Sequence, residues 1–188
     1  VDYQVPRRRE GHGFHARAVR DALADDVSLL ITCDTGIGAR DVVQGAVEAG
    51  LRVVITDHHD LPEILPAAQA VVDPKMLAPD HPLRELAGVG VAYMIARALM
   101  GDGAEGGSLE RMLDLVALGL VGDLARLVAD VRYLVQRGLV ALRRTARPGL
   151  RALARAAELD LEDVDEDSIG YHLAPRLNAA GRLADAEM

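Results

Sequence analysis

The chain has 188 residues, half of them hydrophobic and 27% charged, which is typical of a folded globular protein and excludes a disordered one. Its 29 acidic and 21 basic residues give a formal net charge of −8, which as a single number argues against a polyanion such as DNA as partner. One cysteine, Cys33, excludes an internal disulfide framework. No apolar run reaches the roughly 18 residues of a membrane-spanning helix.

The first half of the chain alternates between helix and strand patterns. A helix is expected over 14–24, and continuous apolar runs rich in β-branched residues predict buried strands at 27–32 and 52–56. The stretch 39–49 predicts a helix between these strands, and 70–72 a short third strand. Because both longer strands are apolar throughout, the strand–helix–strand order predicts a parallel sheet.

The second half of the chain is helical in pattern. Helical spacing of apolar residues is found in 89–100, 109–118, 131–144 and 150–159. We therefore predict an α/β fold, with a parallel-sheet core over 1–125 and a helical connector over 126–188.

Polar side chains follow the first two predicted strands at the point where each strand ends. Asp34 comes after the first strand, and Asp57, His58 and His59 come directly after the second. The carboxyl ends of parallel strands meet at one edge of the sheet, where ligands bind in such folds. Carboxylate and imidazole ligands suit Mn²⁺, Mg²⁺, Fe²⁺ or Zn²⁺, whereas a structural zinc site normally uses several cysteines.

Each of these signals also has an ordinary structural interpretation. An aspartate such as Asp34 after a strand is commonly a turn or helix cap, and Asp57-His58-His59 can be polar residues with a structural role. The turn at Gly36 and Gly38 offers backbone N–H groups to an anion, or serves backbone geometry alone. Cys33, at the strand end, is expected to be a small buried hydrophobic residue.

Two later segments carry further candidates. Asp123 follows an apolar helix in the sequence GLVGD, either as a ligand or as a solvated residue beyond a helix end. Arg176, Asn178 and Arg182 lie in a segment interrupted by proline and glycine. Two guanidinium groups and an amide suit phosphate contacts, and the alternative is a loop with ordinary surface arginines.

Five segments taken in order resemble the DHH phosphoesterase superfamily, and within it the RecJ-like single-stranded-DNA-specific 5′→3′ exonucleases. They read TCDTGIG (32–38), TDHHD (56–60), LAGVGVAY (86–93), GLVGD (119–123) and APRLNAAGR (174–182). VPRRREGHG (5–13) is similar to a further motif of that family, with His12 where an aromatic residue is usual.

The resemblance implies a centre of two Mn²⁺ or Mg²⁺ ions. Asp34 would be the bridging carboxylate, His58 and Asp123 would ligate the second ion, His59 would lie beside the scissile phosphate, and Asp57 would orient the histidines. Contacts to DNA or its phosphates would come from a set that shares His59 with the metal centre: Arg8, Gly36, His59, Arg176, Asn178 and Arg182.

The resemblance implies that the protein hydrolyses single-stranded DNA to 5′-mononucleotides in DNA repair and recombination. It also implies a cytoplasmic location, a single-stranded-DNA-binding protein and a helicase as partners, and no membrane partner. The family's first motif, Asp-x-Asp, has no match here, and neither have its C-terminal DHHA1 and OB-like domains. We therefore expect the chain alone to bind metal weakly and to show little or no activity. The alternatives are a DHH-type phosphodiesterase for oligoribonucleotides or cyclic dinucleotides, and a non-catalytic nucleic-acid-binding or scaffold protein.

The distribution of charge revises the first inference from the net value. Seven of the acids lie within 158–167, whereas 131–157 holds seven arginines and no acid. Local basic strips can neutralise phosphates, so the acidic balance does not exclude DNA. The alternative interpretation is that the arginine-rich stretch is an ordinary solvated helix face.

Overall fold

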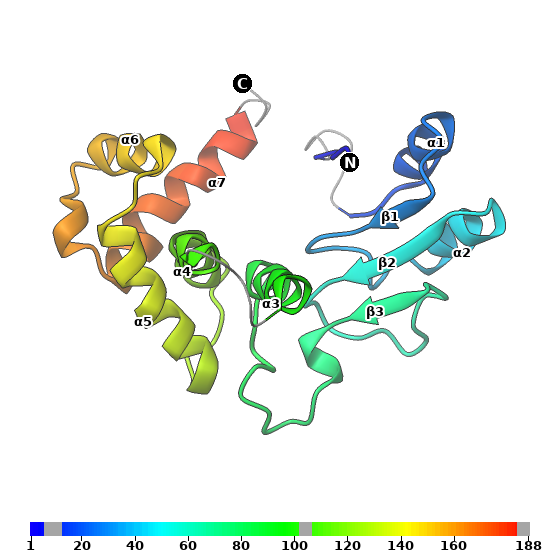
Figure 1. Cartoon of the computed structure of the whole chain (residues 1–188), viewed down its shortest axis with the longest axis horizontal. Coiled ribbons are helices and arrows are strands. Elements are labelled where there is room, and N and C mark those ends of the chain that lie inside the picture. Colours follow the sequence, from blue (N-terminus) through cyan, green and yellow to red (C-terminus); the bar gives the residue numbers. More distant parts are fainter. Residues whose placement is uncertain (6–12, 102–106, 184–188) are drawn as a thin grey trace. The chain divides into compact units, whose positions relative to one another are not determined.

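The computed structural model describes residues 1–5, 13–101 and 107–183, with side chains as far as residue 179. The chain falls into two compact units, residues 1–79 and 80–188, and each is described by itself (Figure 1). The predicted division into a core over 1–125 and a helical connector over 126–188 stays a prediction. Among the described residues, no helix has both the length and the apolar character needed to cross a bilayer.

The first unit is built on a three-stranded sheet in the order β1-β2-β3. Its strands are β1 (Leu29–Ile31), β2 (Arg52–Thr56) and β3 (Ala70–Val72), and its helices are α1 (Ala16–Ala24) and α2 (Arg40–Glu48). β2 is parallel to both neighbours, with Leu30 opposite Val53 and Ile55 opposite Val71. The predicted α/β fold with a parallel sheet is therefore confirmed.

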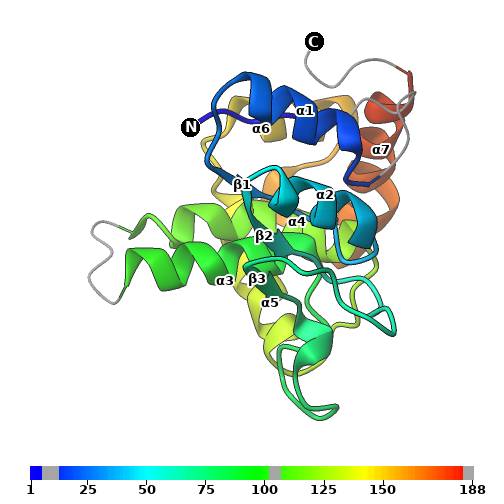
Figure 2. The ribbon, with the colours of Figure 1, turned by 90° about the vertical axis from the view of Figure 1, so that its right-hand side faces the viewer.

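One face of this sheet carries the core of the first unit. Val53 and Ile55 of β2 are fully buried and belong to one hydrophobic cluster with Val19 of α1 and Val43 of α2. Helices α1 and α2 lie side by side (Figure 2). The apolar stripe of each helix thus has its partner in the sheet, which places both helices on this face.

The opposite face corrects one expectation. Because side chains alternate along a strand, Leu29 and Ile31 of β1 point away from the face that carries Leu30, and they are 41% and 56% exposed. β1 is also an edge strand of the described sheet. The prediction of a fully buried strand at 27–32 is therefore wrong, although the strand itself is present. Cys33, expected to be buried, is exposed.

The second unit is helical, as predicted. Its α-helices are α3 (Gly88–Met100), α4 (Leu113–Gly122), α5 (Ala129–Arg143), α6 (Pro148–Ala156) and α7 (Ala174–Leu183). A 3₁₀ turn, η4 (Glu110–Met112), precedes α4, a second, η5 (Leu161–Asp163), follows α6, and a π-helical segment, η6 (Ser168–Leu173), runs directly into α7. The segment 174–182 is helical rather than a loop, and its Pro175 comes just after the π-helical η6.

Helices α4 and α5 form the centre of this unit. A Cβ atom built at Gly138 of α5 would lie 2.4 Å from the carbonyl oxygen of Leu113 and 2.5 Å from Cβ of Ala117, so only glycine lets the two backbones approach this closely. The start of α4 is also tied to the start of α6, because Nε of Arg147 lies 3.0 Å from a carboxylate oxygen of the buried Asp114.

Replacing Gly138 by alanine should therefore destabilise the second unit. The added methyl group has no room, and overpacking of this kind costs about 1–3 kcal/mol. Gly149→Ala is the matched control, because nothing lies within 4 Å of its Cβ position on α6. It should leave stability unchanged or raise it by about 0.4–1 kcal/mol. Urea unfolding followed by circular dichroism measures both, and equal midpoints for the two variants would contradict the packing argument.

Candidate metal centre

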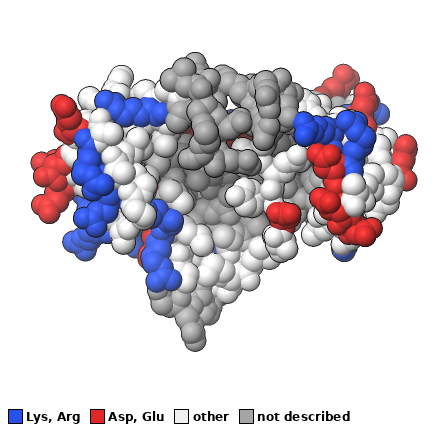
Figure 3. All heavy atoms as spheres, turned by 90° about the horizontal axis from the view of Figure 1, so that it is seen from above, with Lys and Arg blue, Asp and Glu red and all other residues white. Residues whose placement is uncertain are grey.

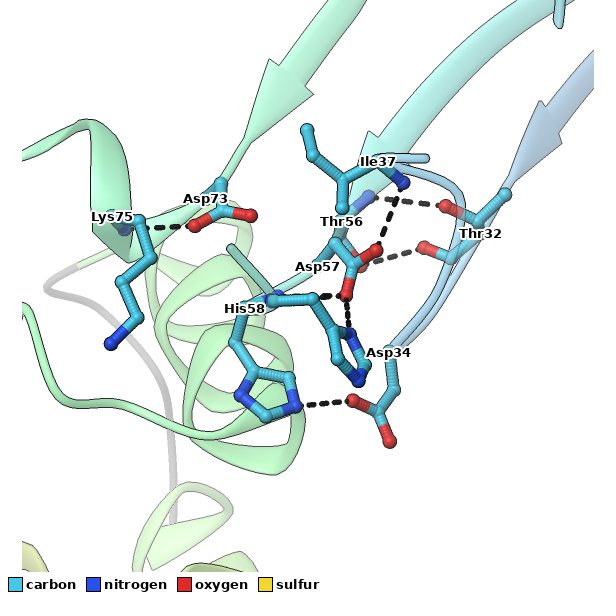
Figure 4. Close-up of polar contacts among 9 residues, drawn as sticks. Thr32, Asp34, Ile37, Thr56, Asp57, His58, Asp73 and Lys75 are labelled. Carbon is cyan, nitrogen blue, oxygen red and sulfur yellow. Dashed lines mark hydrogen bonds and ion pairs between the residues drawn. The ribbon is translucent and has the colours of Figure 1, made fainter. Parts of the chain in front are cut away.

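Each strand of the sheet is followed by an aspartate at the same edge (Figure 4). Asp57 and Asp73 come directly after β2 and β3, and Asp34 lies three residues beyond the end of β1. The N–H of Asp34 donates to the carbonyl oxygen of Thr56 at 2.9 Å, and the N–H of Asp57 donates to that of Val72 at 3.0 Å. Pairing between the strands thus continues up to the acidic residues, which fixes their backbone positions.

The loop after β1 turns sharply toward β2. Asp34 has a φ of 62°, in the left-handed region that aspartate tolerates better than most residues, and Gly36 has a φ of 111°. Two threonines link the strand ends, since Oγ1 of Thr56 donates to the carbonyl oxygen of Thr32 at 2.6 Å, and the Thr56 N–H donates to Oγ1 of Thr32 at 3.3 Å. A Cβ at Gly36 would lie 3.0 Å from that Oγ1 atom, so glycine is required for this turn.

Asp57 is the buried centre of the site, with 1% of its surface exposed. Its Oδ2 accepts a hydrogen bond from the N–H of Ile37 at 2.9 Å, and its Oδ1 accepts from the N–H of His58 at 2.8 Å and contacts Nδ1 of His59 at 2.6 Å. Burial alone would raise the pKa of Asp57, but the hydrogen bonds from His59, Ile37 and His58 outweigh it and lower the pKa. Asp57 is therefore a carboxylate that holds its neighbours.

The outer layer of the site consists of Asp34, His58 and His59. Nε2 of His58 lies 2.9 Å from Oδ1 of Asp34, and one potential ligand atom from each of the three residues falls within 4.8 Å of the others. The imidazole rings of His58 and His59 have their centroids 4.5 Å apart. The Asp34 side chain is 59% exposed, so the cluster is open to solvent, where an ion and a phosphate can reach it.

This set of donors fits a divalent cation. One carboxylate and two imidazoles suit Mn²⁺ and related first-row ions, and a histidine ligand is normally held by a carboxylate on its other side. Asp57 is such a carboxylate for His59. The prediction that Asp34 and His58 lie together at one sheet edge agrees with this geometry, and the structure adds His59 to the group of possible ligands.

Asp73 belongs to this sheet edge and was missed by the sequence reasoning. It is 4% exposed, and its Oδ1 accepts a hydrogen bond from the N–H of Lys75 at 2.8 Å. Its Oδ2 is buried and has no hydrogen-bond partner among the described residues. Burial raises the pKa of Asp73, and the nearby Asp57 adds to the effect. The signal was available, because Asp73 follows the third apolar strand just as Asp57 follows the second.

The second unit contains another predicted ligand, Asp123. It caps the C-terminus of α4, its N–H donates to the carbonyl oxygen of Gly119 at 2.9 Å, and its side chain is exposed. This agrees with the predicted helix end in GLVGD. A metal-binding role for Asp123 stays a prediction.

The predicted phosphate contacts on α7 are placed only in part. Arg176 and Asn178 are exposed, and Nη1 of Arg176 donates to the carbonyl oxygen of His172 at 2.8 Å. Arg182 is on α7, but its side chain lies outside the described residues, as does the whole of Arg8. Their roles stay predictions.

Comparison with known proteins decides the family. A sequence model of the DHH family, N-terminal domain, matches residues 1–120, which is more than half of the chain. The chain belongs to the DHH family. Within this family, Asp57-His58-His59 is the DHH triplet, and its place directly after β2 is the arrangement described above.

The similar proteins include single-stranded-DNA-specific exonucleases named RecJ. That of Bacillus subtilis (strain 168) is 42% identical over 188 residues, which are 100% of this chain and 23% of the relative. A crystal structure of exonuclease RecJ bound to manganese matches with a TM-score of 0.83 and 33% identity, over 97% of this chain and 46% of that one. RecJ from Thermus thermophilus in complex with Mn²⁺ matches with a TM-score of 0.79 and 31% identity, over 95% and 26%. The chain thus spans a quarter to a half of these relatives.

Asp57→Asn should weaken the first unit. An amide can accept on one side only, so either the N–H of Ile37 or the groups from His58 and His59 lose their acceptor. An unsatisfied buried donor costs about 1–3 kcal/mol. Hydrogen–deuterium exchange in the presence of a chelator should show faster exchange of the Ile37 amide. Asp60→Asn, an exposed change in the same loop, is the control, and unchanged exchange at Ile37 in Asp57→Asn would contradict the assignment.

Asp73→Asn should have the opposite effect on stability. Because the pKa of Asp73 is raised in the folded state, the folded protein loses stability as the pH rises from the usual aspartate value through that raised pKa. Asparagine does not titrate, so the variant should unfold at higher urea than the wild-type chain at pH 7, and the gap should close near pH 3. A lower midpoint for the variant at pH 7 would show that an ionised Asp73 stabilises the fold.

Proposed function

We propose that the protein containing these residues is a metal-dependent exonuclease that hydrolyses single-stranded DNA from the 5′ end and releases 5′-mononucleotides. The observation that carries this proposal is the cluster of Asp34, His58 and His59 at the carboxyl edge of the sheet. The relatives of Bacillus subtilis and other bacteria that are named for this activity align with nearly the whole chain, which supports the choice of substrate.

The residues of the candidate site would have different roles in metal binding and hydrolysis. Asp34 and His58 would be ligands in a centre of two Mn²⁺ or Mg²⁺ ions, and Asp123 of the second unit stays a further predicted ligand. The RecJ structures with Mn²⁺ and Mg²⁺ support the choice of metal. Bound ions of this kind activate a water molecule and neutralise charge on the phosphate. His59 would contact the scissile phosphate, and Asp57 would act as a positioning residue, because it fixes the orientation of the His59 ring through Nδ1.

Residues other than the metal ligands would bind the DNA strand. The N–H groups of the turn at Gly36 would face a phosphate, and Arg8, Arg176, Asn178 and Arg182 would contact the backbone or the 5′ end. Guanidinium groups suit this role because they bind phosphate in a bidentate manner. The wider proposal places the protein in cytoplasmic DNA repair and recombination, with a single-stranded-DNA-binding protein and a helicase as partners.

The test, made on the full-length protein that contains these residues, is the loss of metal binding and cleavage in Asp34→Asn. Asparagine keeps the left-handed backbone but removes the anionic ligand, so calorimetry should show at least a tenfold weaker Mn²⁺ affinity. Even the loss of a residue that only hydrogen-bonds to a metal ligand lowers metal affinity about 10–100-fold. Release of mononucleotides from 5′-labelled single-stranded DNA should fall with it. Asp26→Asn is the matched control, because Asp26 is an exposed aspartate of the same unit with a φ of 53°.

Two results would overturn the proposal. One is wild-type cleavage by Asp34→Asn in the presence of Mn²⁺. The other is efficient cleavage of a short oligoribonucleotide or cyclic dinucleotide together with inert long single-stranded DNA, which would assign the protein to a different DHH phosphodiesterase activity.

A further inference from the structure

The solvent-facing side of α5 carries several arginines between residues 132 and 144. With 3.6 residues per turn, the exposed residues from 132 to 144 fall on one face of the helix, while the opposite side carries the buried Val131, Val135, Leu139 and Leu142. The exposed members are Arg132, Tyr133, Gln136, Arg137, Val140, Arg143 and the C-cap Arg144. This arginine face is held outward by the packing of α5 on α4.

Most of these guanidinium groups are not neutralised. Arg132, Arg137 and Arg144 form no ion pair with any residue in the described part of the chain. Nε of Arg143 donates to the carbonyl oxygen of Val164 at 3.0 Å, so this arginine links α5 to the end of η5 instead.

Few acids are close to this face. Asp130 in the first turn is the one acid on α5, and η5, which packs against α5, brings Glu162 and Asp163. Asp165, two residues beyond η5, is close enough to Arg143 for an electrostatic interaction. None of these acids forms an ion pair with the arginines of the face. Figure 3 shows Lys and Arg side chains on the outer side of the second unit, with Asp and Glu side chains beside them.

An exposed aromatic ring lies among the arginines. Tyr133 is 54% exposed, in a chain with only five aromatic residues. Cζ of Arg137 lies 6.0 Å from the centre of its ring, and Nη1 of Arg137 donates to its hydroxyl group at 3.2 Å. A tyrosine ring oriented by an arginine offers a flat apolar surface next to a positive charge, which is the combination that binds unpaired nucleotides.

We propose that this face of α5 binds single-stranded DNA, with Arg132, Arg137 and Arg144 on successive phosphates and Tyr133 stacked on a base. The proposal rests on the proposed function, because it assigns the same substrate to a second surface. From Arg132 to Arg144 the helix rises roughly 18 Å, a length that spans several phosphates of an extended strand. Stacking on Tyr133 requires an unpaired base, which favours a single strand over a duplex.

The experiment measures binding rather than cleavage, so its outcome does not depend on the metal centre. Fluorescence anisotropy follows a fluorescein-labelled oligothymidylate bound by the 188-residue chain in EDTA, over a series of salt concentrations. The main variant is Arg137→Ala/Arg144→Ala. Its matched control is Arg20→Ala/Arg97→Ala, which removes two exposed arginines of α1 and α3 that likewise form no ion pair with a described residue. Circular dichroism confirms that each variant is folded.

The Arg137→Ala/Arg144→Ala variant should bind more weakly and with less dependence on salt. Each phosphate contact on a single strand contributes about 0.7 to the slope of log affinity against log salt, so the slope should fall by about 1.4. Tyr133→Ala should lower the affinity about 5- to 150-fold without changing the slope, because stacking involves no counterion release. The control variant should keep the wild-type slope.

The proposal fails if the wild-type chain does not bind the strand, or if Arg137→Ala/Arg144→Ala binds with wild-type affinity and slope. Equal loss in the control variant would also overturn it, since the effect would then reflect net charge alone. A duplex of the same length that binds as tightly as the single strand would contradict the role of Tyr133. The two proposals can fail separately. If Asp34→Asn loses cleavage but still binds DNA, binding by α5 is supported. If the protein cleaves DNA although α5 does not bind it, the proposed function is supported and the role of α5 is wrong.

Discussion

The candidate site depends on the carboxylate of Asp57. It joins the loop before α2, through the N–H of Ile37, to the end of β2, through the N–H of His58 and the ring of His59. A buried carboxylate is costly unless hydrogen bonds satisfy it, so these contacts stabilise each other and leave one arrangement of the loop. The exposed ligands are thus supported by a buried group that need not touch the substrate. Without Asp57, the Asp34 loop and the histidine ring would lose their common anchor.

Most of the fold could be predicted because periodicity reports which side chains must be buried. Strands 52–56 and 70–72 were placed as the structure has them, and α2 and α3 were placed within one residue at each end. The helix predicted at 109–118 was misplaced, because α4 begins and ends four residues later, at Leu113–Gly122. Burial at β1 was predicted wrongly, because an apolar run does not show whether both faces of its sheet are covered in the part described. The helix at 174–183 was also missed as a helix, because its proline and glycine are typical of loops in sequence.

The site was predictable to the extent that it follows from strand ends. That rule brought Asp34 and His58 together, and it extends to Asp73, which follows β3 in the same way but was overlooked. The left-handed backbone at Asp34 and the hydrogen bonds that lower the pKa of Asp57 depend on tertiary contacts that no local pattern contains. Likewise, the seven arginines between 131 and 157 are visible in sequence, whereas the exposure of Arg132, Arg137 and Arg144, and their lack of an ion pair with a described residue, are properties of the folded helix.

The close approach of α4 and α5 at Gly138 has a consequence for recognition. With the backbones in contact there, α5 cannot roll about its axis or slide along α4 without steric overlap. The side chains on its outer surface therefore keep a fixed spacing and direction before any partner arrives. A preorganised surface loses little backbone entropy on association, so more of the gross interaction energy is available as affinity. A glycine buried between two helices thereby contributes to binding at a surface that it never touches.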